Sequence, residues 1–238
     1  MQSSNVIRKE LMHYQENELI FASKLYKTKL YDQISEAAFY KTLERMCKSG
    51  ELIKIAKGTY HLPKISKYGI VPPSEKEIIN TFIKDGTGTI VGYSLYNALN
   101  LTTQVAKSIE VMSSALDSFT KTIRNVTVNQ VQIDYSENVI NMIHGLEVLQ
   151  NYYNIQDINN LSFTIFAEEL ANQYDEEVFK KVISKINYKK STIAFLREIL
   201  NFYGKENNLD MYLSSLSEYK YPKMEEIYEI ARVSNLIQ

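Results

Sequence analysis

One stretch of the sequence spaces its polar and basic side chains so that they share one face of a helix. After Ser35, the apolar residues Phe39, Leu43 and Met46 recur at i, i+4 and i+7, which is the spacing of a buried helical stripe. The face opposite that stripe carries Glu36, Tyr40, Lys41, Glu44, Arg45 and Lys48. Lysine and arginine contact phosphates, and arginine can donate two hydrogen bonds to the edge of a guanine. The pattern favours contact with double-stranded DNA.

Within this helix the residues have separate expected roles. Arg45 is predicted to read a guanine, while Tyr40 and Lys41 lie nearer the amino end, where base contacts are usual. Ser35 is a suitable N-cap beside the same surface, and Gly50 stands where a left-handed C-cap is expected. The sequence thus predicts a helix with a defined start and end that presents a DNA-binding face.

Further lysines flank the helix on both sides in the sequence. Lys54 and Lys57 lie in or beside the tip of a predicted hairpin, and Lys24, Lys27 and Lys29 flank a predicted short helix. Such residues are expected to contact phosphates and fix the register on DNA without reading its sequence. A solvated charged face is the competing interpretation of the charges alone.

The elements that must position these side chains follow a recognisable order. Apolar spacing predicts a helix over 5–14, an extended segment over 18–21 and a brief helix over 22–27. Two β-prone runs, 52–55 and 59–62, follow the third helix, and Gly58 can supply a positive φ between them. Three helices and a hairpin predict a winged helix-turn-helix over residues 1–68.

Two further regions are predicted beyond this unit. Pro72 and Pro73 interrupt helix, and Ser74 with Glu77 forms a capping box. A short helix over 92–99 and strands over 108–112, 122–128 and 131–135 indicate a small α/β domain over 69–135. Residues 136–238 have helical spacing almost throughout, and this helical region is expected to pack on the middle domain. The fold class predicted is α+β.

Composition narrows the class of protein. The chain has 238 residues, 45% of them hydrophobic, and a net charge of -1, the balance of a globular protein. Residues 1–68 carry 12 Lys or Arg against 7 Asp or Glu, whereas the remainder is acidic, as expected for a nucleic-acid-binding unit on an acidic body. No membrane segment or signal peptide is predicted, so a cytoplasmic protein is expected. Cys47 is the only cysteine and is predicted to pack as a small hydrophobe.

Catalytic and metal chemistry find little support. His13, His61 and His144 lack partners at ligand spacing and are predicted to be surface or partly packed side chains. Residues 86–92 miss the dinucleotide-binding glycine spacing and are expected to form a turn. The adjacent carboxylates at 168–169 and 225–226 diverge on a helix and are expected to face solvent. No enzyme activity, metal or cofactor is predicted.

The segment from Phe39 to Tyr60 resembles the winged helix of the antitoxins of abortive-infection E (AbiE-type) toxin-antitoxin systems. In that pattern a helix ending in Lys-x-Gly leads to a wing ending in Lys-Gly-x-Tyr, matched here by Lys48 with Gly50 and by Lys57-Gly-Thr-Tyr60. The resemblance continues through Pro72-Pro73 and the stretch Gly92–Val105, over about the first 130 residues, and weakens beyond except at Gly145–Gln150.

This resemblance implies a bacterial type IV antitoxin that binds operator DNA, represses its own operon and is paired with a nucleotidyltransferase-like toxin, without requiring a stable complex with that toxin. The competing hypothesis is an interaction module that docks the toxin or another protein through exposed tyrosines, of which the chain has 18 in total. The operator sequence, the toxin's target and the oligomeric state are not specified by the sequence.

Overall fold

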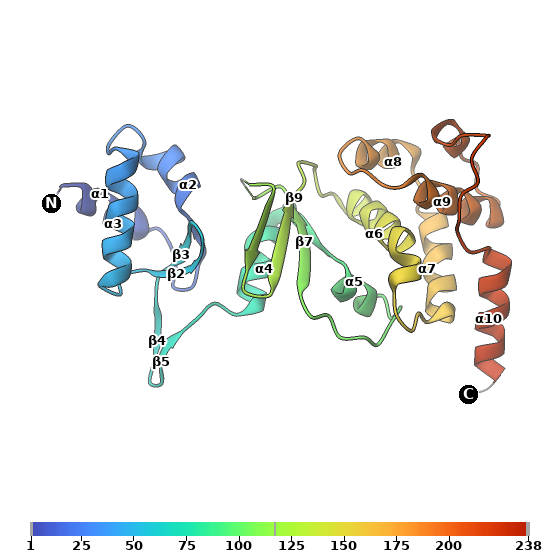
Figure 1. Cartoon of the computed structure of the whole chain (residues 1–238), viewed down its shortest axis with the longest axis horizontal. Coiled ribbons are helices and arrows are strands. Elements are labelled where there is room, and N and C mark those ends of the chain that lie inside the picture. Colours follow the sequence, from blue (N-terminus) through green and yellow to red (C-terminus); the bar gives the residue numbers. More distant parts are fainter. Residues whose placement is uncertain (1, 117, 237–238) are drawn as a thin grey trace.

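The computed structural model describes residues 2–116 and 118–236. The chain forms an elongated molecule in which an amino-terminal unit, a central sheet and a group of carboxyl-terminal helices follow one another along the long axis (Figure 1). The two ends of the described chain lie at opposite ends of this arrangement. Helices and small sheets are both present, so the predicted mixture of α and β structure is confirmed at this level.

The amino-terminal unit combines three helices with a small sheet. Its helical segments are α1 (Gln2–Leu11), α2 (Ala22–Leu25), the π-helical η1 (Tyr26–Leu30) and α3 (Glu36–Lys48). Its strands are β1 (Ile20–Phe21), β2 (Ile53–Ala56) and β3 (Thr59–His61), arranged antiparallel in the order β1-β3-β2. A core that includes Ile7, Phe39 and Leu43 joins α1 to α3.

Local signals fixed the bounds of α3 and of the hairpin as predicted. The hydroxyl of Ser35 accepts from the Ala38 backbone N–H at 3.4 Å, which satisfies one of the free donors at the start of the helix. Gly50 has φ +78° and Gly58 has φ +67°, a left-handed conformation that costs a residue with a Cβ more than it costs glycine. Cys47 is half-buried against the core, as expected.

A second hairpin follows, which the sequence interpretation did not include. Strands β4 (Lys64–Ser66) and β5 (Gly69–Val71) pair antiparallel and project from the molecule as an isolated ribbon (Figure 1). Residue 68, the predicted boundary between the first and second domains, lies in the turn of this hairpin. We call residues 64–71 the arm.

The central unit contains a four-stranded sheet. Its elements are α4 (Glu75–Ile83), the 3-10 turn η2 (Lys84–Gly86), β6 (Gly88–Val91), α5 (Tyr93–Ala98), β7 (Ile109–Ser113), β8 (Thr120–Ile123) and β9 (Val126–Gln130). The order is β6-β7-β9-β8, with β7 and β9 parallel and the outer pairs antiparallel. The capping box of Ser74 and Glu77 and the helix near 92–99 are present as predicted.

Two strand assignments and one turn assignment in this unit were wrong. The run 122–128 is two strands joined by a tight turn at Arg124, whose φ is +56°, and no glycine or proline marked that turn in the sequence. Residues 131–135 lie outside the strands, although Ile133 and Tyr135 are buried. Residues 86–92, expected to form a turn, contain strand β6.

The two faces of the central sheet pack against different neighbours. One face supplies Val111 and Val128 to a cluster that also contains Leu19 and Phe82, with Phe21 packed against it. The amino-terminal unit and α4 therefore share a hydrophobic contact. The opposite face and α5 belong to a larger cluster formed mostly by the carboxyl-terminal helices.

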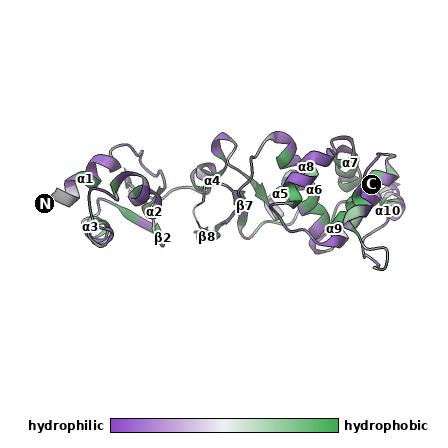
Figure 2. Ribbon diagram, turned by 90° about the horizontal axis from the view of Figure 1, so that it is seen from above, coloured by the Kyte–Doolittle hydropathy of each residue, from purple (hydrophilic) through white to green (hydrophobic). Residues whose placement is uncertain are grey.

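The carboxyl-terminal helices are α6 (Glu137–Asn151), α7 (Asn160–Asn172), α8 (Glu176–Ile183), α9 (Lys190–Phe202) and α10 (Met224–Leu236), with 3-10 turns η3 (Tyr152–Asn154) and η4 (Leu209–Tyr212) between them. Figure 2 shows their hydrophobic residues interleaved with hydrophilic ones, as the helical spacing predicted. Among the described residues, no helix is both long and apolar enough to cross a membrane.

Candidate nucleic-acid interface

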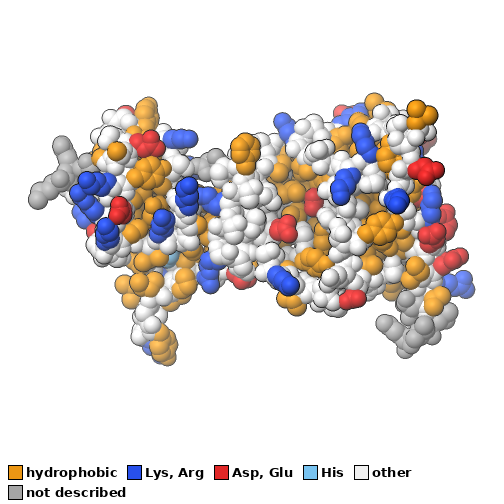
Figure 3. Space-filling view, in the orientation of Figure 1, with side chains coloured by type: hydrophobic (Ala, Val, Ile, Leu, Met, Phe, Trp, Pro, Cys, Tyr) orange, Lys and Arg blue, Asp and Glu red, His pale blue; other side chains and the backbone are white. Residues whose placement is uncertain are grey.

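Helix α3 presents a polar face to solvent. Phe39, Leu43 and Met46 are buried as predicted, together with Thr42. All the polar positions predicted on the other face are exposed: Glu36, Tyr40, Lys41, Glu44, Arg45 and Lys48. Figure 3 shows basic side chains gathered on the amino-terminal unit at the left of the view.

Grooves flank this face on two sides and separate the residues predicted to act together. Lys41 and Arg45 line a groove of about 480 Å³ between α3 and α1. Tyr40 lines another groove, of about 510 Å³, which α3 shares with η1, the β2–β3 turn and strand β8. Arg45 and Tyr40 therefore lie at opposite edges of the exposed face, and Glu44 and Lys48 lie between them.

One ion pair on the exposed face of α3 determines which of its cations can bind a ligand. Lys48 Nζ lies 2.9 Å from Glu44 Oε1, and this hydrogen bond holds the pKa of the Glu44 carboxyl below its usual value, with Lys41 and Arg45 adding to the effect. In the part of the chain that the structure describes, Lys41 and Arg45 form no ion pair. Both cations are therefore available to an anionic ligand.

Arg8 reinforces the groove on the α1 side. Its Nε and Nη2 donate to Glu51 Oε2 and Oε1 at 2.8 and 3.1 Å, and the Ser49 hydroxyl also donates to Glu51 at 2.8 Å. These bonds lower the pKa of the Glu51 carboxyl. The contact links α1 to the turn after α3, so it fixes the orientation of α3 within the unit.

The flanking lysines are all exposed but do not share one surface. Lys27 and Lys57 line the groove beside Tyr40. Lys54 is exposed on β2 near Cys47, where burial raises the pKa of the thiol and the charge of Lys54 partly opposes this rise. Lys24 instead lines a cleft between the amino-terminal unit and α4. Lys29 is exposed without lining any of these grooves.

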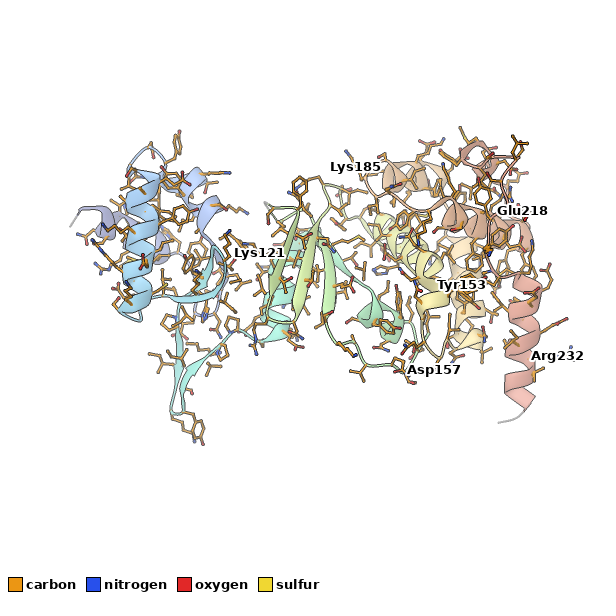
Figure 4. All side chains as sticks on the ribbon, viewed as in Figure 1. Lys121, Tyr153, Asp157, Lys185, Glu218 and Arg232 are labelled. Carbon is orange, nitrogen blue, oxygen red and sulfur yellow. The ribbon has the colours of Figure 1, made fainter. Side chains whose placement is uncertain are left out.

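Strand β8 adds side chains to the candidate interface that sequence reasoning missed. Lys121, Thr120 and Thr122 line the same groove as Tyr40 and Lys57. Lys121 Nζ donates to Thr59 Oγ1 at 2.9 Å and to the Lys57 carbonyl at 3.3 Å, and Figure 4 shows it between the two units. No sequence signal relates positions 60 residues apart, so this contribution could be found only from the tertiary structure.

Two histidine assignments are corrected or refined. His61, predicted to be a surface or partly packed side chain, is instead buried, with an exposed fraction of 1%, on β3, the middle strand of its sheet. His144 is half-buried, its Nε2 lies 2.7 Å from the Thr89 hydroxyl, and desolvation lowers its pKa to about 4. His13 is exposed, and so are the carboxylate pairs at 168–169 and 225–226.

Over the described ranges, no cluster of three or more His, Cys, Asp or Glu side chains is suited to a metal ion.

Comparison with known proteins places the chain in a family. A family of unknown function, DUF6088, matches residues 7–141. The chain belongs to this family. The DUF6088 segment spans the amino-terminal unit, the arm and the central sheet, and it ends within α6. It therefore contains the α3 face and, except for Ser4, the residues that line both grooves beside it. No curated protein matches the chain.

Proposed function

We propose that this DUF6088 protein binds double-stranded operator DNA through a winged helix-turn-helix and represses transcription. The observation that carries the proposal is the exposed face of α3, on which Lys41 and Arg45 form no ion pair with any described residue and Glu44 is paired with Lys48. In this assignment α3 enters the major groove, which admits an α-helix and displays a distinct pattern of donors and acceptors for each base pair.

The neighbouring elements support the same assignment. The β2–β3 hairpin would be the wing, and Lys54 and Lys57 are exposed on it. Lys27 is exposed on η1 across the groove from the hairpin turn. Contacts from these lysines to phosphates supply affinity and register, while Arg45 and Tyr40 at the edges of α3 supply base contacts. The excess of basic residues in 1–68 over an acidic remainder is consistent with this division.

The proposed biological role is that of an AbiE-type antitoxin. The residue pattern from Lys48 to Tyr60 and the stretch 92–105 support this role. The protein would then repress the operon that encodes it and a nucleotidyltransferase-like toxin. Co-expression tests this part: the antitoxin should restore growth to cells that express the neighbouring gene product, and failure to do so would remove the antitoxin role while leaving DNA binding intact.

The first experiment measures binding of the full chain to the promoter fragment upstream of its gene and to an unrelated fragment of equal length and base composition. Salt is varied because each phosphate contact contributes about 0.9 to the slope of log K against log salt. A preference for the promoter that persists at moderate salt is expected. Equal binding to both fragments, or none, would exclude a sequence-specific repressor.

A docking role for the same surface is the second candidate. Tyr31 and Tyr40 have exposed fractions of 67% and 37% near the amino end of α3, and tyrosine is an effective interface residue. A stoichiometric partner retained after nuclease treatment, and lost in Tyr31→Ala but not in Tyr153→Ala, would favour docking. Tyr153 is a suitable control because it is 69% exposed in the carboxyl-terminal unit, away from α3 (Figure 4).

A further inference from the structure

The arm exposes apolar side chains that nothing else in the described chain covers. Ile65 and Ile70 are cross-strand partners and have exposed fractions of 76% and 55%. Tyr68, in the turn, is 88% exposed. Figure 3 shows the arm projecting below the amino-terminal unit with hydrophobic side chains along it and at its tip. An isolated two-stranded hairpin is at best marginally stable in water, so such a ribbon is better explained by a partner than by its own stability.

The arm is held firmly at its base. Pro63 and Pro72 flank its strands, and proline restricts φ to a narrow range. Arg124 Nη1 donates to the carbonyl of Pro73 at 2.8 Å, which anchors the arm to the central unit. At the tip, the Ser66 hydroxyl accepts from the Tyr68 N–H at 3.1 Å and donates to the Gly69 carbonyl at 3.0 Å. These contacts define the direction in which the arm projects, while its apolar side chains remain exposed.

The charges of the arm select the class of partner. Residues 64–71 contain Lys64 and Lys67 and no Asp or Glu, and both lysines are exposed. Lys67 Nζ lies 4.9 Å from the centre of the Tyr68 ring, so positive charge accompanies the apolar tip. Two arms from two copies of the chain would bring lysines together without a carboxylate between them. A polyanion satisfies the lysines of one arm directly.

We propose that the arm enters the minor groove of the DNA that flanks the site bound by α3, an inference that rests on the proposed DNA binding. Two-stranded ribbons are narrow enough to enter a groove, and proteins that bind the minor groove insert apolar side chains between base steps. Ile65, Ile70 and Tyr68 are the inserting side chains, and Lys64 and Lys67 contact the phosphates on either side. In Figure 1 the arm extends past the carboxyl end of α3, so DNA that continues beyond this end of the helix would reach the arm.

The absence of tryptophan from the sequence permits a direct test. Tyr68→Trp places a single indole at the tip of the arm, and Tyr153→Trp places one on the carboxyl-terminal unit as the matched control. On titration with the promoter fragment, the emission of Tyr68→Trp should be quenched as the indole stacks on bases, whereas that of Tyr153→Trp should not change. A bound fragment that leaves the emission of Tyr68→Trp unchanged would overturn the inference.

A second measurement separates the arm from α3. The double variant Lys64→Ala, Lys67→Ala should reduce the salt slope by about 2 on a promoter fragment with long flanks, and by nothing on a fragment trimmed to the site bound by α3. If the double variant changes the salt slope by the same amount on both fragments, the arm does not contact the flanking DNA, while the proposed function stands. If the unaltered chain binds no DNA, both proposals fail.

Variants of the arm also test whether it binds a second copy of the chain instead of DNA. The molar mass of the unaltered chain and of Ile65→Ser, Ile70→Ser is measured by light scattering at matched concentrations. Equal masses agree with the DNA assignment. A dimer that the double variant converts to a monomer, with quenching of Tyr68→Trp by protein concentration alone, would assign the arm to self-association instead.

Discussion

Lys121 Nζ lies 2.9 Å from Thr59 Oγ1, and this hydrogen bond joins strand β8 of the central sheet to strand β3 of the amino-terminal unit. The same ammonium group lies 5.3 Å from the centre of the Phe21 ring. The lysine thus contacts a hydroxyl, a backbone carbonyl and an aromatic face of the other unit at once. Together with the apolar cluster around Phe82, it fixes the orientation of the β2–β3 hairpin relative to the rest of the protein.

Replacing Lys121 with methionine should loosen this junction. Lys121→Met keeps most of the aliphatic stem but removes both hydrogen bonds. Hydrogen bonds to charged groups contribute about 1.5 to 3 kcal/mol each, but exposure of these bonds to solvent reduces their contribution. We expect the free energy of unfolding to fall by about 1 kcal/mol and amide exchange over 57–61 to accelerate. Lys185→Met, at an exposed site in the carboxyl-terminal unit (Figure 4), is the control. Unchanged exchange in Lys121→Met would show that the cluster alone holds the junction.

Arg45→Ala should impair recognition of sequence. Loss of a bidentate contact to guanine is expected to weaken binding to the promoter by about 1 to 3 kcal/mol and to leave binding to unrelated DNA nearly unchanged. Electrophoretic mobility shifts on the two fragments measure both. Arg232→Ala removes the same charge at an exposed site on α10 and should alter neither value. Equal losses on both fragments would assign Arg45 to a phosphate contact.

Lys57→Ala should weaken binding regardless of sequence. A lysine at the hairpin turn that contacts one phosphate contributes affinity for all DNA, so the salt slope is expected to fall by about 1 on both fragments. Lys185→Ala is the matched control. A loss confined to the promoter would contradict the assignment of the hairpin to backbone contacts.

Glu44→Gln should strengthen binding to all DNA. The substitution removes a carboxylate from the centre of the α3 face and releases Lys48, which now pairs with it at 2.9 Å. We expect a steeper salt dependence, by about 1 in slope, because one more cation can reach a phosphate. Glu218→Gln makes the same change at an exposed site far from α3. Weaker binding by Glu44→Gln would mean that the carboxylate itself accepts a hydrogen bond from DNA.

His144 should make stability depend on pH. Its folded pKa is lowered to about 4 by burial, while an unfolded histidine has a pKa of about 6.5. The unfolded state therefore binds the proton first, and stability should fall as the pH falls from about 6.5 to about 4, by up to about 3 kcal/mol in total. The free energy of unfolding in urea is compared, as a function of pH, between the unaltered chain and His144→Gln. The raised pKa of the buried Glu147 changes stability in the opposite direction to His144, but it does so equally in both proteins, so their difference isolates His144. If stability changes with pH by the same amount in the two proteins, His144 makes no such contribution.

The helices of this protein were predictable because their signals are local. Ser35 and the pair of Ser74 and Glu77 mark starts that depend on bonds within three residues, and the spacing of Phe39, Leu43 and Met46 identified the buried side of α3. The exposed face of α3 followed from the same spacing. Its division into two edges, with Arg45 and Tyr40 apart, depended on where α1 and β8 pack, which is not a local property.

The strands were harder to predict because their partners are distant. Gly88 belongs to β6, where a Cβ would lie 2.4 Å from the Met112 carbonyl oxygen, so a close approach between strands and not a turn requires glycine there. The turn at Arg124 has no glycine, and the run on either side of it was taken for one strand. His61 is buried on the middle strand of a sheet whose other two strands are distant or separate runs of the sequence, so the residues next to it did not predict its burial.

The elongated arrangement of the three units has a consequence for regulation. When one end of the molecule is bound, the other end lies the full length of the molecule away. In the proposed complex with DNA, the carboxyl-terminal helices lie at the far end of the molecule from α3, so a macromolecule bound there would not compete with DNA for space.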